Sequence, residues 1–227
     1  MKYSKLIIPV LVVGVVVLIG VSWWGSREPV DEGVSSPEAN LAEEGIPASS
    51  LTEILATAKD LPSYTLDMVT SYPGGEAVTA RLWIKDGSRK LESAAEGETM
   101  IYLLQAATQS SYIYFPESKT GMQLDWDTAQ TTAEGMLGEQ LTDLETHQPT
   151  IVGEEILDGK DCLVTQWTTE EAEGKSWIWK EYGFPIRTEM TVEGETIVTE
   201  IKNIQIGNIA DSEFELPDDI QITALPQ

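Results

Sequence analysis

The sequence is poor in the residues that most often carry catalysis and metal binding. It holds one cysteine, Cys162, and one histidine, His147, in 227 residues. A single cysteine excludes an intramolecular disulfide and any multi-cysteine metal site. A single histidine excludes the histidine-rich catalytic metal centres. The chain also lacks a Gly-rich phosphate loop and a Gly-x-Ser-x-Gly elbow. We therefore expect a binding protein rather than an enzyme, without metal or cofactor.

Basic residues are scarce as well. The chain has 14 Lys and Arg against 38 Asp and Glu, a formal net charge of −24. This composition excludes nucleic acid as a partner, because neutralising phosphates requires clustered Lys and Arg. Hydrophobic residues make up 41% of the chain, which is enough for a sizeable core and excludes global disorder. We expect an acidic folded protein.

An uncharged apolar run, Leu6–Trp24, lies near the N-terminus. It is long enough to cross the hydrocarbon core of a bilayer. Lys2 and Lys5 precede it, and the sequence after it is acidic, so we expect the N-terminus to face the cytoplasm. The remainder of the chain is then extracytoplasmic.

Two interpretations of this run are open. Trp23 and Trp24 resemble the interfacial aromatic belt of an uncleaved, single-pass membrane anchor. Gly20 and Ser22 form a small-x-small pattern that suits signal-peptide cleavage near Ser22. The first interpretation leaves the protein tethered to the cell membrane, and the second releases it into the periplasm or the medium.

The composition changes along the chain and indicates how it is organised. Residues 26–48 are acidic and rich in Pro, Ser and Gly, which is typical of an extended linker. We therefore expect a transmembrane or signal segment over residues 1–25, a linker over residues 26–48 and one folded domain over residues 49–227.

The domain is predicted to begin with a helix and to continue with strands. Ser50–Glu53 forms a capping box, and apolar residues continue at helical spacing until Pro62. Beyond Pro62 the apolar period changes to that of strands, and Asp86-Gly87 and Asp158-Gly159 predict tight two-residue turns. The predicted strands cover residues 64–72, 78–85, 89–93, 100–104, 111–115, 122–126, 150–157, 161–167, 176–180, 186–192 and 196–206.

A second helix is expected in the middle of the chain. Asp127 can cap it, and Ala129 to Leu144 hold apolar residues on one face. Gly135 and Gly138 lie in its interior, where each glycine costs about 1 kcal/mol relative to alanine. The segment is either an ordinary packing helix or a mobile lid.

The predicted fold class is α+β, predominantly β. Strands joined by short connections form an antiparallel sheet, because parallel strands need long crossovers. About 10–11 strands are too many to stay flat, so we expect a single curved antiparallel sheet, a half-open barrel, with helices covering its concave face. Some strands carry bulky apolar residues on both faces, such as Ile178 between Trp177 and Trp179. The face that the helices leave free can form an apolar pocket, and the alternative is that these aromatic residues are simply core.

The order of short motifs resembles the LolA/LolB-like superfamily of outer-membrane lipoprotein carriers and receptors. The motifs are Tyr64–Asp67, Leu82–Lys85, Tyr112–Tyr114 and the closing Phe214–Ile220. The stretch Trp177–Arg187 resembles the superfamily's exported, membrane-anchored relatives of unassigned role. The resemblance implies an unclosed antiparallel barrel with helices as a lid over a cavity that accepts acyl chains.

These observations predict an extracytoplasmic, membrane-tethered protein that binds a lipid, a lipoprotein acyl chain or another apolar ligand, with the glycine-containing helix as a gate. A non-catalytic envelope sensor or interaction module, whose cavity is filled by its own side chains and whose surface binds an envelope protein, is the alternative. A Cys162–His147 nucleophile pair and an Asp125–Asp127 carboxylate pair are less favoured than packing and helix capping. The predicted ligand-binding residues are Leu82, Met100, Tyr102, Tyr112, Tyr114, Met122, Leu124, Met136 and Leu137.

Overall fold

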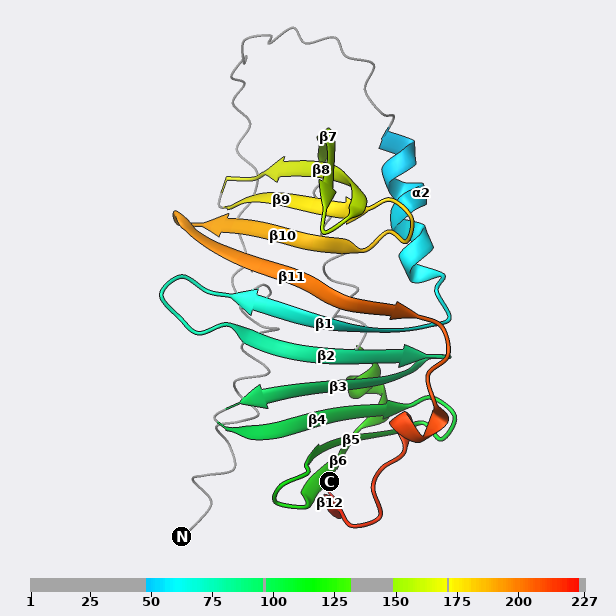
Figure 1. Cartoon of the computed structure of the whole chain (residues 1–227). Coiled ribbons are helices and arrows are strands. Elements are labelled where there is room, and N and C mark those ends of the chain that lie inside the picture. Colours follow the sequence, from blue (N-terminus) through cyan, green and yellow to red (C-terminus); the bar gives the residue numbers. More distant parts are fainter. Residues whose placement is uncertain (1–47, 96, 132–148, 171, 225–227) are drawn as a thin grey trace, which may run out of the picture. The chain divides into compact units, whose positions relative to one another are not determined.

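The computed structural model describes residues 48–95, 97–131, 149–170 and 172–224 (Figure 1). A helix opens this part of the chain and strands make up most of the rest. The elements are α2 (Ala48–Lys59), β1 (Ser63–Ser71), β2 (Val78–Lys85), β3 (Ser88–Ala95), β4 (Glu98–Gln105), β5 (Ser110–Phe115), β6 (Thr120–Leu124), β7 (Thr150–Leu157), β8 (Lys160–Thr168), β9 (Ala172–Trp179), β10 (Pro185–Val192), β11 (Glu195–Ile206), the 3-10 helix η1 (Asp211–Phe214) and β12 (Gln221–Ala224).

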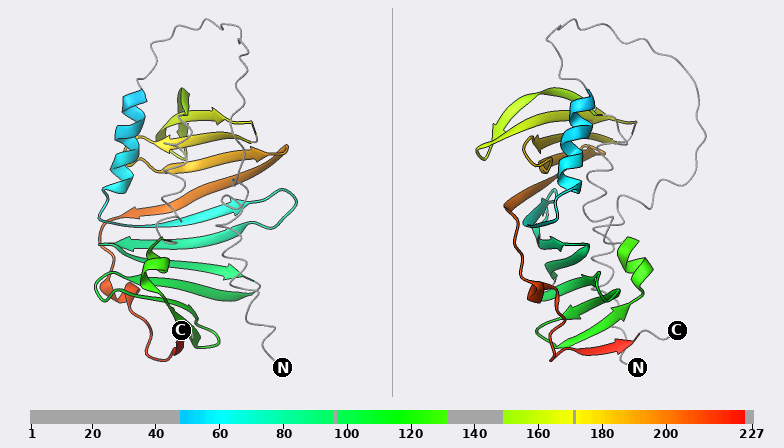
Figure 2. Two further views of the ribbon diagram at one scale, coloured as in Figure 1. Left: turned by 180° about the vertical axis from the view of Figure 1, so that it is seen from behind. Right: turned by 90° about the vertical axis from the view of Figure 1, so that its right-hand side faces the viewer.

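All strands belong to one 12-stranded sheet in the order β12-β6-β5-β4-β3-β2-β1-β11-β10-β9-β8-β7. The sheet curves and stays open, with β12 and β7 at its two edges (Figure 2). Neighbouring strands from β6 to β7 run antiparallel. The expected single curved sheet is therefore confirmed.

One strand was not predicted and changes the expected topology. β12 pairs with β6 in parallel, with Gln221 opposite Thr120, so the sheet is not wholly antiparallel. The expectation of 10–11 antiparallel strands is wrong in this respect. The reason is that the chain reaches the β6 edge after crossing one face of the sheet, and this crossing, rather than a hairpin turn, sets the direction of β12.

The predicted tight turns are present. Asp86 and Gly87 have φ of 48° and 80°, and Asp158 and Gly159 have φ of 49° and 73°. Positive φ at both central residues is the geometry of a type I′ hairpin turn, which suits the right-handed twist of the strands. These turns fix the pairing of β2 with β3 and of β7 with β8.

The second helix begins at a different residue from the one expected. Residues 126–131 are helical. The cap is Asp125, because its Oδ1 accepts from the Thr128 backbone N–H at 3.0 Å and from the Thr128 hydroxyl at 2.9 Å. The expected cap at Asp127 is wrong, since the helix starts earlier than the apolar spacing suggested. The rest of the predicted helix, with Gly135 and Gly138, lies outside the described residues.

The apolar run at residues 6–24 and the linker also lie outside the described residues. Within the part of the chain that the structure describes, no helix is both long and apolar enough to span a bilayer.

The buried apolar residues form two clusters. The larger joins α2, through Leu51 and Leu55, to strands across the sheet, including Leu66 and Tyr102. The smaller joins β4 and β5 to the C-terminal segment through Phe214. Figure 2 shows α2 and residues 126–131 on one side of the sheet and η1 on the other. The two faces of the sheet are thus covered by different parts of the chain.

The contact between α2 and the sheet depends on a glycine. Gly183, between β9 and β10, has φ of 73° and donates its backbone N–H to Trp179 O at 2.8 Å. A Cβ at this position would lie 2.0 Å from Ile54 O and 3.1 Å from Ala58 N, both in α2. Only glycine allows the helix backbone to approach this closely.

Replacing Gly183 by alanine should therefore destabilise the fold more than an equivalent change elsewhere. The matched control is Gly159→Ala, because Gly159 has the same φ of 73° and its added Cβ would meet only open space. Left-handed backbone alone costs about 1–2 kcal/mol in both variants. Overpacking against α2 should add about 1–3 kcal/mol in Gly183→Ala. Urea denaturation of the full chain in mild detergent measures the difference, and equal losses in the two variants would contradict the proposed close contact.

Candidate functional site

The side chains of β1–β6 that point toward α2 form an apolar surface, here called the inner face. Residues directly opposite each other on neighbouring strands project to the same side of a sheet. The strand register therefore assembles rows across the sheet, of which the central one runs through Leu66, Leu82, Leu91, Tyr102, Ile113 and Met122. Flanking rows contain Met68, Ala80, Ser93 and Met100 on one side, and Tyr64, Ile84, Arg89, Leu104, Ser111 and Leu124 on the other.

The structure places the predicted ligand-binding residues on both faces. Leu82, Met100, Tyr102, Met122 and Leu124 all lie on the inner face. Their role in ligand binding stays a prediction.

Tyr112 and Tyr114 lie on the opposite side, here called the outer face, so the structure does not place them in the same lining. They pair with Leu103 and Ile101 and belong to the cluster around Phe214. The alternation of side chains along β5 did not show which of its two faces would point toward the helices. The register of β5 with β4 places Tyr112 and Tyr114 on the outer face. Met136 and Leu137 lie outside the described residues.

The outer face of β2–β5 is covered by the chain's own C-terminal segment. Phe214 packs there, and its carbonyl oxygen accepts a hydrogen bond from Gln105 Nε2 at 2.7 Å. Lys85 Nζ donates to Ile209 O at 2.9 Å, and Lys90 Nζ pairs with Glu213 Oε2 at 3.0 Å. These bonds hold the C-terminal segment on the sheet. The packing of Phe214 in the smaller cluster accounts for the apolar side chains on this face.

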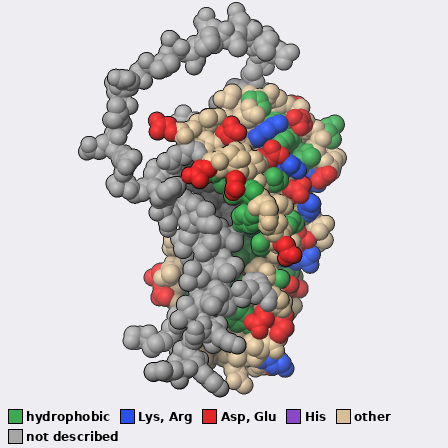
Figure 3. Space-filling view, turned by 90° about the vertical axis from the view of Figure 1, so that its left-hand side faces the viewer, with side chains coloured by type: hydrophobic (Ala, Val, Ile, Leu, Met, Phe, Trp, Pro, Cys, Tyr) green, Lys and Arg blue, Asp and Glu red, His purple; other side chains and the backbone are tan. Residues whose placement is uncertain are grey.

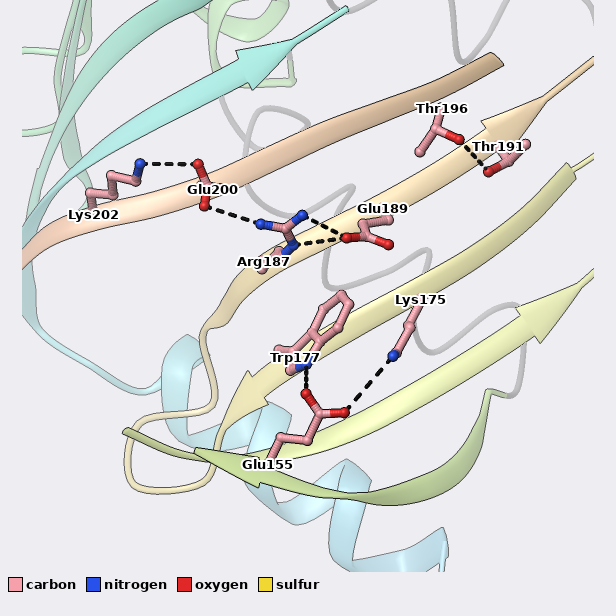
Figure 4. A network of polar contacts seen from close by, with 9 residues as sticks. All are labelled: Glu155, Lys175, Trp177, Arg187, Glu189, Thr191, Thr196, Glu200 and Lys202. Atoms are coloured by element: carbon pink, nitrogen blue, oxygen red, sulfur yellow. Dashed lines mark hydrogen bonds and ion pairs between the residues drawn. The ribbon is translucent and has the colours of Figure 1, made fainter. Parts of the chain in front are cut away.

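The outer face of the other half of the sheet is polar and internally paired (Figure 4). Arg187 Nη2 lies 2.7 Å from Glu189 Oε1, and its Nη1 lies 3.3 Å from Glu200 Oε1. Trp177 Nε1 donates to Glu155 Oε2 at 2.7 Å, while Lys175 Nζ stands 4.4 Å from the centre of the Trp177 ring. Acidic and basic side chains are intermixed on the surface that Figure 3 shows. These contacts pair Arg187 and Lys175 with acidic residues of the same face.

The inner face contains a basic residue that is not among the ligand-binding residues predicted from the sequence. Arg89 pairs with Ile84 on β2 and with Leu104 on β4. Its Nε is shielded from solvent and has no hydrogen-bond partner in the described part of the chain. A signal for it was present in the sequence, because the two-residue turn Asp86-Gly87 fixes the register and sets Arg89 opposite an apolar residue.

Two tyrosines of the inner face are close enough to Arg89 to feel its charge. Burial raises the pKa of Tyr64 to about 12, and the guanidinium of Arg89 opposes that rise. Burial raises the pKa of Tyr102 to about 12 as well, again with Arg89 acting in the opposite direction. Both phenols are therefore protonated and neutral at pH 7, so neither supplies a negative charge to Arg89.

Tyr102 also connects the inner face to the second helix. Its hydroxyl donates to the backbone oxygen of Ala129 at 2.6 Å, and this bond is buried. Together with the cap at Asp125 it fixes where residues 126–131 leave the sheet. The pKa of the Asp125 carboxyl is lowered, chiefly by the hydrogen bond from the Thr128 backbone.

The other groups considered from the sequence have structural surroundings. Cys162 is fully buried, and burial raises the pKa of its thiol, which disfavours the nucleophilic thiolate. His147 lies outside the described residues. In the described ranges no three His, Cys, Asp or Glu side chains gather as a possible metal site.

A surface pocket of about 380 Å³ lies apart from the inner face, at the turn between β7 and β8. It is lined by Gly159, Lys160, Asp161, Trp179, Lys180 and Glu181. Lys180 is paired with Glu154 at 2.9 Å, so one of the two ammonium groups in the pocket is already compensated. This polar, exposed pocket does not suit an apolar ligand.

Comparison with known proteins shows that the fold of this chain is similar to that of solved structures. No family model matches the chain, and no curated protein matches it. An uncharacterised conserved protein from Thermus thermophilus has a solved structure that is 14% identical, with a TM-score of 0.52, over 78% of this chain and 99% of that one. At this identity the similarity shows the fold alone.

Two other solved structures match less closely. The lipoprotein LppX of Mycobacterium tuberculosis is 11% identical, with a TM-score of 0.47, over 72% of this chain and 97% of that one. A LolA superfamily protein from Nitrosomonas europaea is 13% identical, with a TM-score of 0.34, over 73% of this chain and 97% of that one. The chain therefore shares the fold of the Thermus thermophilus protein.

Removing the Tyr102 hydroxyl should loosen the start of the second helix. Tyr102→Phe leaves the buried Ala129 carbonyl without its donor, which we expect to cost about 0.5–1.5 kcal/mol. Amide hydrogen exchange of residues 126–131 should accelerate, while exchange in β9 and β10 should not change. Tyr112→Phe, on the outer face, is the control. Unchanged exchange at residues 126–131 would show that this bond does not hold the helix.

The raised tyrosine pKa values also predict how stability depends on pH. An unfolded tyrosine titrates near pH 10, and Tyr64 and Tyr102 titrate near 12 in the folded protein. Between these values the folded state binds more protons than the unfolded state, so the free energy of unfolding decreases as pH rises. Denaturant titrations from pH 9 to 12 should show this decrease. Tyr64→Phe and Tyr102→Phe should each make it shallower, and an unaltered slope in both variants would contradict the assignment.

Proposed function

We propose that the protein binds an apolar ligand, a lipid or a lipoprotein acyl chain, on the inner face of β1–β6. The observation that carries this proposal is the continuous row of apolar side chains from Leu66 on β1 to Met122 on β6. The outer face of the same strands has its own cover in the C-terminal segment. The resemblance of the sequence to lipoprotein carriers and receptors supports the same class of ligand.

Binding would be stabilised by removal of apolar surface from water. Each methylene group of an acyl chain contributes about 0.8 kcal/mol when it is fully buried. The inner-face residues of β6, Met122 and Leu124, remain partly exposed, whereas Leu82 and Met100 are 4% and 2% exposed. The β6 end of the inner face is therefore where we expect a ligand to make its first contact.

We further propose that the domain is extracytoplasmic and that the apolar run at residues 6–24 serves as its membrane anchor or signal. The charge distribution around that run supports this orientation. Membrane fractionation of expressing cells distinguishes the two forms. An intact chain in the membrane fraction supports an anchor, and a soluble chain shortened by about 22 residues supports cleavage.

One observation favours a second candidate function, a non-catalytic sensor or interaction module. Leu82, Leu91, Tyr102 and Leu104 are already buried by the protein itself. An interior filled by its own side chains leaves the surface as the functional part. On the edge strand β7, Val152 and Ile156 are 50% and 75% exposed. An exposed strand edge with apolar side chains is suited to pairing with another chain.

A charge placed on the inner face should abolish acyl binding. Met122→Lys puts an ammonium group among apolar side chains, where ligand binding would have to desolvate it. The matched control is Gln123→Lys, which adds the same charge on the next residue, on the outer face. We expect Met122→Lys to lower the amount of co-purified lipid at least about tenfold, whereas Gln123→Lys should retain it.

The measurement is native mass spectrometry and lipid extraction of the full chain, with competition by a fluorescent acyl probe. Equal lipid content in the two variants would contradict binding on the inner face. A wild-type chain that carries no lipid and binds no probe would instead support the interaction module, which predicts stoichiometric recovery of one envelope protein in a pull-down.

A further inference from the structure

We infer that the inner face selects amphiphiles with an anionic head group, and that Arg89 recognises that group. The inference rests on the proposed function, because it presumes that an acyl chain occupies the inner face. It adds the chemical class of the ligand and the orientation in which it lies.

The first argument is charge. Among the described residues that project from β1–β6 to the inner face, Arg89 is the only basic one. The only acidic one is Glu98, an exposed residue at the start of β4 and at the opposite end of the strands. Neighbouring cations behave differently, since Arg81, Lys85 and Lys90 project to the outer face and have acidic partners there.

The second argument is the state of the guanidinium. Its Nε is buried, and no described residue accepts a hydrogen bond from it. A buried donor without an acceptor is unfavourable, and buried polar groups in folded proteins are nearly always paired. An arginine fork matches a carboxylate or a phosphate with two parallel hydrogen bonds. A ligand oxygen at this point would complete the pairing that the described protein leaves open.

The third argument is the surroundings of Arg89. The side chains next to it in its row are Ile84 and Leu104, so the local environment is apolar and strengthens an ionic hydrogen bond. The neutral phenols of Tyr64 and Tyr102 lie within range of its charge and do not neutralise it. Within the described structure, Arg89 is therefore not paired with an acidic side chain.

The position of Arg89 also sets an orientation for the ligand. It lies near the β2–β3 turn, in the row at one end of the inner face. The rows of Leu91 and Ser93 follow toward the other end, each about 7 Å further along the strands. A chain anchored by its head group at Arg89 would thus extend over the apolar rows toward Met100.

The test compares two probes of equal chain length, dodecanoate and dodecanol, on the full chain in a sterol-based detergent. Displacement of a fluorescent acyl probe gives the dissociation constant of each. We expect wild type to bind dodecanoate at least about tenfold more tightly than dodecanol. Arg89→Met, which keeps much of the side-chain volume, should lose this preference while still binding dodecanol. Arg89→Lys should retain part of it.

The control is Lys90→Met, which removes the same charge from the next residue on the outer face and should leave the preference unchanged. Circular dichroism and the binding of dodecanol establish that each variant is folded. A preference that persists in Arg89→Met, or that is absent from wild type although both probes bind, would overturn the assignment of Arg89. Binding of neither probe would overturn the proposed function and this inference together.

Discussion

A sheet whose strands carry apolar side chains on both faces has to be covered on both sides, and the rest of this structure follows from that constraint. On β4, Tyr102 and Leu104 project to one face while Ile101 and Leu103 project to the other, and all four are buried. α2 and the start of the second helix lie over the inner face, and the segment around Phe214 covers the outer one. The C-terminal segment is therefore part of the core rather than a tail, and its crossing of the sheet is what brings β12 to the β6 edge.

The distribution of charge follows the same division into faces. On the outer face, cations lie against acids, as at the partly buried pairs Arg81–Asp67 and Arg187–Glu200. Arg89 is in the opposite situation, a basic side chain among apolar neighbours in a protein of net charge −24. The overall negative charge would slow the approach of an anionic amphiphile, but beyond about 8 Å that field is screened at physiological salt. The local cation would therefore act on which ligand is retained rather than on how fast it arrives.

The inner face and the second helix are linked by few but specific contacts. Tyr102 lies in the same row as Leu82 and also holds Ala129, so one side chain belongs both to the candidate binding surface and to the anchor of the helix. Its neighbour in the row, Leu91, is two residues beyond Arg89 on the same strand. A ligand on this surface would thus contact the residue on which the position of the helix depends, which gives binding a physical route to the placement of that helix.

The sequence by itself determined the β-rich class, the opening helix, the segments of β1–β11 and the Asp-Gly turns, because apolar spacing and turn residues are local properties of the chain. The sequence also showed that Tyr112 and Ile113 project to opposite faces of the sheet. It did not show which of these faces the helices would cover. Only the tertiary structure decided that Tyr114 joins Phe214 rather than Tyr102, that Asp125 rather than Asp127 caps the helix, and that β12 runs parallel to β6. Those outcomes depend on contacts between residues far apart in the chain, whose geometry no local pattern records.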